Sequence, residues 1–145
     1  MYSMVKRVSV FALAMLTLIM GVVVPFRKAE AAIMYNNTTD AYLSCSVNSN
    51  GQLQASMSVV GIKNKTTRID IELYVEKRIL GVFWSRVDIG YPNNIWTAST
   101  SNYSYSHTFT TNLPSSGTYK VTVTYTVSGS GGSDDIIERT ETIQF

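Results

Sequence analysis

The chain has 145 residues, with 12 basic and 10 acidic side chains, one histidine and one cysteine. Four of the basic residues and one acidic residue fall in the first 31 positions, so the remainder holds 8 basic and 9 acidic residues and a net charge of −1. The near-neutral remainder with no basic stripe argues against nucleic-acid binding, and the lone cysteine excludes an internal disulfide.

The first 31 residues have the three parts of a secretory signal peptide. Lys6 and Arg7 form a basic start, residues 8–24 form an apolar run, and Ala29-Glu30-Ala31 matches an A-x-A cleavage site. A run of 17 residues also lies at the short end of what spans a bilayer, so retention as a membrane anchor is the alternative. We expect cleavage after Ala31 and an exported domain of about 113 residues, a size that suits one core.

Residues 32–40 are polar and predict a flexible leader before a folded domain over residues 41–145. In that domain apolar residues recur at every second position, which is the pattern of strands with one buried face. The alternation over residues 41–47 and 53–59 predicts a hairpin. Its turn is Asn48-Ser49-Asn50-Gly51, because Asn and Gly tolerate the positive φ of a tight turn.

Five more strands are expected further along the chain, and Arg139 and Glu141 interrupt the alternation of the last one, as at a bulge or a sheet edge. Half-buried antiparallel strands need a second sheet over their apolar face. The pattern therefore predicts an all-β domain, a single antiparallel β-sandwich of about seven strands without a disulfide. The five expected strands cover residues 68–76, 83–89, 103–109, 119–127 and 136–145.

Residues 113–121 read Leu-Pro-Ser-Ser-Gly-Thr-Tyr-Lys-Val, which resembles the corner before the sixth strand of immunoglobulin-like and fibronectin type III domains. The resemblance implies that the Tyr119 hydroxyl bonds to the chain a few residues upstream, with Leu113 packed beneath it. Val121 stands where the second disulfide cysteine would be, which implies a disulfide-free form of that fold. Residues 41–145 also resemble small secreted β-sandwich proteins of unknown function from Gram-positive bacteria, a likeness that implies a fold and no activity.

Few side chains suit catalysis or metal binding. His107 lies on the inward phase of its strand and is expected to be a hydrogen-bonded structural imidazole rather than a catalytic one. Asp134, Asp135 and Glu138 suit a solvated loop better than a weak cation site, because their spacing does not match a calcium loop. Cys45 lies on an apolar phase and is expected to be a buried, inert thiol. We expect no catalytic residue, no metal and no cofactor, and hence no enzyme.

The segment from Lys77 to Arg86 is apolar at its centre, where hairpin turns are normally polar. If exposed, such a patch marks a contact with a protein partner or a membrane, and cations beside aromatic rings suit an anionic headgroup region. The alternative is that the residues before the turn fold onto the end of the sandwich while the aromatic ones begin a strand. The candidate contact residues are Ile79, Leu80, Val82, Phe83 and Trp84.

A second candidate surface consists of Tyr91, Trp96 and Tyr103, which lie in or beside a loop rich in asparagine. Planar rings next to amides suit stacking on sugars, although tyrosine also favours the outer faces of strands for reasons of packing. The sequence thus favours a secreted contact module, free or associated with the cell surface, whose partner is a cell-envelope component or another protein. A carbohydrate-binding module and a membrane-interacting protein are the alternatives.

Overall fold

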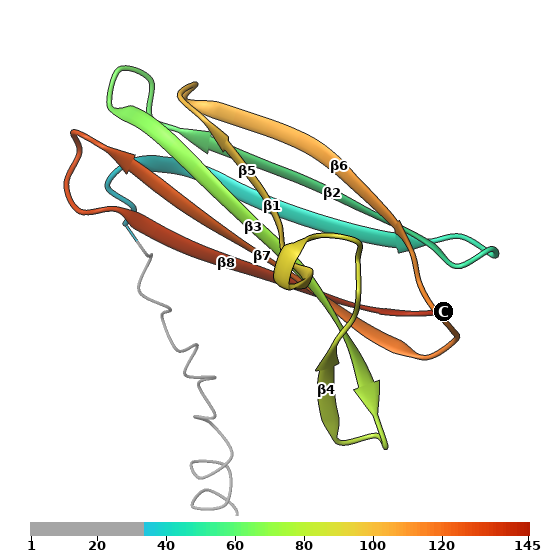
Figure 1. Cartoon of the computed structure of the whole chain (residues 1–145). Helices are drawn as coiled ribbons and strands as arrows, with labels where there is room; N and C mark the ends of the chain where they lie inside the picture. Colours follow the sequence, from blue (N-terminus) through green and yellow to red (C-terminus); the bar gives the residue numbers. More distant parts are fainter. Residues whose placement is uncertain (1–33) are drawn as a thin grey trace, which may run out of the picture. The chain divides into compact units, whose positions relative to one another are not determined.

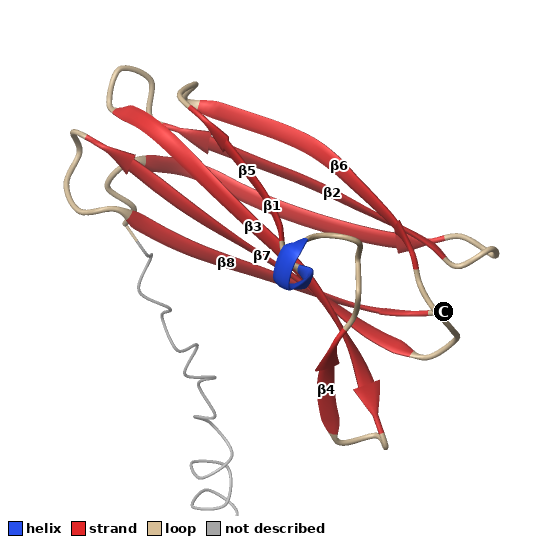
Figure 2. Ribbon diagram, viewed as in Figure 1, coloured by secondary structure: helices blue, strands red, loops and turns tan. Residues whose placement is uncertain are grey.

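The computed structural model describes residues 34–145, which form an all-β sandwich of two antiparallel sheets (Figures 1 and 2). This confirms the predicted fold class, whereas the signal peptide expected over residues 1–31 lies outside the described residues. The described part contains eight strands and one short 3₁₀ turn: β1 (Thr38–Val47), β2 (Gln52–Gly61), β3 (Thr66–Ile79), β4 (Phe83–Arg86), η1 (Pro92–Asn94), β5 (Trp96–Thr100), β6 (Ser104–Asn112), β7 (Thr118–Gly129) and β8 (Asp135–Gln144).

The smaller sheet has the strand order β1-β2-β6, and the larger one has the order β4-β3-β7-β8 with β5 also paired to β3. The 14-residue β3 is long enough to serve two short neighbours in succession. It pairs with β5 over residues 69–73 and with β4 over residues 76–79. The end of β3 therefore extends beyond the sandwich and carries the β3–β4 hairpin.

The core lies between the two sheets and follows the predicted alternation. In β3, Ile69, Ile71, Leu73 and Val75 are buried while the residues between them face outward. Removing each such side chain from water contributes roughly 1.5–3 kcal/mol. Other buried side chains come from every strand except β4; they include Leu43, Leu53, Met57, Val59, Trp96, Phe109, Tyr119, Val121, Val123, Tyr125, Val127 and Ile137.

The folded part begins earlier than expected, because residues 36–38 bind a carboxylate from the other end of the chain. The backbone N–H groups of Asn36 and Asn37 donate to Asp135 Oδ1 and Oδ2 at 2.8 and 2.7 Å, and Thr38 Oγ1 donates to Oδ2 at 2.9 Å. Burial by itself would raise the pKa of Asp135, but these hydrogen bonds outweigh it and lower the pKa. We call this arrangement the Asp135 clamp; it places residues 36–40 in the fold, where the sequence had suggested a flexible leader.

Two other expectations differ from the structure. The strand expected over residues 83–89 ends at Arg86, and the turn-rich segment 90–102 contains β5, which was not foreseen. The interrupted alternation of β8 marks a sheet edge and not a bulge, because its register with β7 is unbroken. Arg139 turns toward β1 and donates from Nε to the carbonyl of Ala41 at 3.0 Å.

Candidate functional site

The β3–β4 hairpin projects from the sandwich as a separate arm (Figure 1). Pairing between β3 and β7 ends at Lys77, so the last residues of β3 have only β4 as a neighbour. The turn holds Leu80 and Gly81 at positive φ angles of 51° and 71°, and the N–H of Val82 donates to the carbonyl of Ile79 at 3.1 Å. Gly81 accepts this conformation at no steric cost, whereas Leu80 does not.

Four large apolar side chains surround this turn and are exposed to solvent. Leu80 is 87% exposed, Val82 69%, Phe83 65% and Ile79 40%. We call these four residues the hairpin tip. Of the two interpretations that the sequence left open, the structure has the tip exposed, because the long β3 carries it away from the end of the sandwich. Phe83 and Trp84 do begin a strand, β4, as the alternative expected.

Cationic side chains flank the hairpin tip. Residues 76–86 contain three cations and one carboxylate, and strand pairing adds Lys120 from β7 opposite Glu76. The Lys120 ammonium lies 2.8 Å from Glu76 and 4.7 Å from the centre of the Trp84 ring. Arg78 also lies over that ring, at 5.9 Å. Trp84 is half-buried under these cations and is a support for the arm rather than part of the exposed surface.

A second cation–aromatic pair lies on the same outer face. The Arg86 guanidinium of β4 sits 3.8 Å from the centre of the Tyr74 ring in β3. Local sequence reasoning missed Lys120, because only the strand register opposite Glu76 brings it beside the hairpin. The resulting surface combines an apolar tip with a positively charged base.

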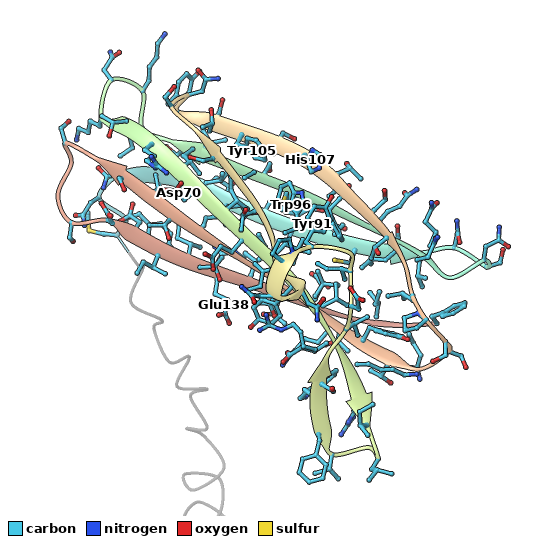
Figure 3. The ribbon with its side chains drawn as sticks, in the orientation of Figure 1. Asp70, Tyr91, Trp96, Tyr105, His107 and Glu138 are labelled. Carbon is cyan, nitrogen blue, oxygen red and sulfur yellow. The ribbon has the colours of Figure 1, made fainter. Side chains whose placement is uncertain are left out.

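The three aromatic residues of the proposed sugar site do not form one exposed platform. Trp96 is only 8% exposed and stacks on His107, with ring centres 5.0 Å apart and planes 6° apart. Tyr91 leans against Phe109 at 6.1 Å, and Tyr103 lies in the loop before β6. Figure 3 shows Tyr91, Trp96, Tyr105 and His107 gathered where β5 and β6 approach each other.

His107 differs from the expected structural imidazole in its exposure. It has the inward phase that the sequence predicted, but its side chain is exposed because β6 is the outer strand of its sheet. Its contact is the face of Trp96, with Tyr105 at 6.2 Å. The ring therefore lies at an open seam between the sheets.

The corner before β7 contains a local tyrosine hydrogen bond and a buried leucine. The Tyr119 hydroxyl donates to the carbonyl of Ser115 at 2.5 Å, and Leu113 is buried in the core. The second core tyrosine, Tyr125, donates across the sandwich to the carbonyl of Tyr42 at 2.6 Å. Both bonds satisfy hydroxyls that burial would otherwise penalise.

The remaining polar candidates, Cys45 and Asp135, lie in surroundings that suit a structural role. Cys45 is only partly buried, whereas the sequence predicted a buried thiol. This partial burial still raises the pKa of the thiol to about 12, with a further contribution from the charge of Glu141, so the thiol stays protonated. Asp135 is occupied by the clamp described above. Among residues 34–145 no cluster of three or more His, Cys, Asp or Glu side chains is placed to hold a metal ion.

Comparison with known proteins assigns the chain to no family. No protein-family model matches the chain, and no curated protein is significantly similar to it. Within residues 34–145, no helix has the length and apolar character needed to cross a bilayer.

Proposed function

We propose that this protein is an exported, non-enzymatic β-sandwich that contacts the cell envelope by placing its hairpin tip in an anionic bilayer surface. The observation that carries the proposal is the exposure of Leu80 at a turn position that disfavours leucine. An asparagine or glycine there would relieve the backbone and solvate the turn. A leucine that costs stability and buries nothing is best accounted for by a surface that covers it.

The apolar part of the contact is sufficient for reversible binding. The exposed fractions of the four tip residues together amount to about two and a half whole side chains. At about 2 kcal/mol for each large side chain removed from water, their insertion supplies about 5 kcal/mol. This is the range of a marginal, reversible membrane anchor, so a second attraction is needed for stable attachment.

The basic residues at the base of the hairpin supply that second attraction. Lys77, Arg78 and Arg86 lie within the arm, and only Glu76 opposes them there. A cation near an anionic bilayer contributes about 1 kcal/mol, and salt screens this contribution. The proposed contact therefore requires anionic lipid and weakens with ionic strength.

The other parts of the proposal, export and the immunoglobulin-like arrangement, have separate support. The signal-like first 31 residues support export, and the Tyr119 corner with buried Leu113 supports an immunoglobulin-like arrangement of the sandwich. The burial of Trp96 gives no support to a sugar platform made with Tyr91 and Tyr103.

The test is co-sedimentation of residues 32–145 with anionic liposomes, zwitterionic liposomes and purified cell-wall sacculi. The fragment is suitable because residues 34–145 enclose a complete core. We expect pelleting with anionic liposomes and its loss in the Val82→Ser/Phe83→Ser variant. Ile136→Ser is the matched control, because Ile136 is 73% exposed but lies on β8.

Equal pelleting of the double variant and the wild type would contradict a role for the tip. Pelleting with sacculi alone would replace the bilayer with a wall component. Failure to pellet with any of the three would refute the envelope contact and leave a soluble protein as the remaining kind of partner.

A further inference from the structure

The outer edge of β6 is open to pairing in a way that the other sheet edges are not. The strand is nine residues long, contains no charged residue and no proline, and keeps an unbroken register with β2. Charges, proline and bulges are the usual means by which edge strands avoid pairing with another chain. This surface lies apart from the hairpin tip, so the inference goes beyond the proposed function.

The competing edges are short, charged or occupied. Strands β4 and β5 have four and five residues. Strand β8 carries Glu138, Arg139 and Glu141, and the Arg139 side chain occupies the Ala41 carbonyl at the edge of β1. Strand β1 also has a register shift between Thr38 and Asp40. Of the sheet edges in residues 34–145, that of β6 is therefore the one best suited to pair with an added strand.

The direction of the unpaired backbone groups in β6 follows from two hydrogen bonds at its ends. The N–H of Leu113 donates to Gly51, and the N–H of Gly61 donates to the carbonyl of Tyr103, in the same register as the strands between them. Hydrogen-bonded pairs alternate along an antiparallel ladder. The odd-numbered residues of β6 thus bond to β2, and the even-numbered ones present N–H and C=O groups outward: Ser104, Ser106, Thr108, Thr110 and Asn112.

We propose that this edge pairs with β6 of a second copy of the chain, antiparallel and centred on Thr108. A two-fold axis there places Thr108 opposite its own copy, Ser106 opposite Thr110, and Ser104 opposite Asn112. All five outward N–H groups of each strand then have acceptors, and the two three-stranded sheets join into one. Closed two-fold pairing of this kind is the commonest form of homo-oligomer.

A second copy is the occupant that this strand fits, because the edge is complementary to itself. The pairs of even-numbered residues across the axis join small neutral side chains, so no like charges meet on the outer face, and Thr–Thr pairs are favourable neighbours across strands. On the inner face the same register sets His107 opposite Phe109 of the second copy. This covers the inward-phase His107 ring that the single copy leaves exposed.

The experiment measures the mass of residues 32–145 by sedimentation equilibrium over a concentration series. We expect a dimer for the wild type, for Thr108→Val and for the Val82→Ser/Phe83→Ser hairpin variant. Thr108→Lys and Thr108→Glu should each weaken dimerisation by about tenfold or more, because two like charges then face each other directly. Thr108→Val is the matched control, since it also loses the 3.2 Å contact between Thr108 Oγ1 and Ser56 Oγ.

Mixing the Thr108→Lys variant with the Thr108→Glu variant provides the decisive arm, because opposite charges at the axis should restore the dimer. Ser106→Pro gives an independent check on dimerisation. The proline removes an outward N–H and leaves the bonds to β2 in place, so the variant should dimerise more weakly than the wild type. A monomeric wild type up to its solubility limit would overturn the proposal. A dimer that is lost in the hairpin variant, or one that the mixture fails to restore, would overturn it as well.

Discussion

Replacing Leu80 with asparagine should change stability and membrane binding in opposite directions. Leucine at φ 51° bears the steric cost of the left-handed region, roughly 1 kcal/mol, whereas asparagine tolerates it. The Leu80 side chain is 87% exposed, so its removal sacrifices almost no packing. We expect Leu80→Asn to stabilise the domain by about 0.5–1 kcal/mol in urea unfolding.

The same substitution removes most of one apolar side chain from the contact surface. At about 2 kcal/mol for full burial, an 87% exposed leucine supplies about 1.7 kcal/mol, so binding to anionic liposomes should weaken about 20-fold. Leu80→Ala is the control, because it loses the apolar surface but keeps a side chain at positive φ, and it should weaken binding without the gain in stability. A destabilised Leu80→Asn protein, or one that binds as tightly as the wild type, would refute the reasoning.

Three further predictions concern the sandwich itself. Tyr119→Phe removes the 2.5 Å bond to the Ser115 carbonyl and should cost about 1–1.5 kcal/mol in urea unfolding, whereas Tyr42→Phe, at a residue that is 52% exposed, should cost nothing measurable. The folded pKa of Asp135 is lowered, so its stabilising effect is complete above the unfolded value of about 3.9 and is lost as the pH falls through the folded pKa. Asp135→Asn should therefore be less stable than the wild type at pH 7, and its stability should depend less on pH in the acid range. Parallel curves of stability against pH for the two proteins would contradict this. Because the pKa of Cys45 is raised to about 12, the native thiol should resist alkylation at pH 8 and react once urea unfolds the domain; rapid native labelling would contradict the raised pKa.

The sequence predicted well those strands whose two faces differ. Over residues 69–75 of β3 and 119–127 of β7 every second residue is apolar and buried, so the alternation alone indicates which side faces the core. The first hairpin was equally accessible, because its turn places Gly51 at φ 76°, a conformation for which glycine is the best residue. In these segments local preference and tertiary environment agree.

The sequence was a poorer guide to the burial of residues whose neighbours are set by strand order or by distant parts of the chain. His107 has the phase of a core residue but is exposed, because β6 is the last strand of its sheet. Nothing in the sequence around His107 indicates that edge position. Asn37 has the local sequence of a linker residue, yet it is fully buried and donates its N–H to Asp135. That burial could not be predicted locally, because Asp135 lies 98 positions away. Local periodicity carries no information about such pairings.

The hairpin falls between these cases. Its apolar composition was evident, but its exposure depends on the length of β3 relative to β7, which the pattern of the segment itself does not specify. The same holds for Lys120, which reaches the arm only through the register opposite Glu76. The candidate residues were therefore identifiable from the sequence, while their arrangement required the fold.

The Asp135 clamp also constrains the order in which the domain can assemble. Its hydrogen bonds join residues that are 97 to 99 positions apart, so they close only after the final strand is available. Contacts of such separation are slow to form, because a long loop must close before any energy is returned. A chain that emerges N-terminus first must hold β1 without its clamp until β8 has followed. The strand of the sandwich that emerges first is thus the last to be secured, and a chain stopped before Asp135 would never complete the clamp.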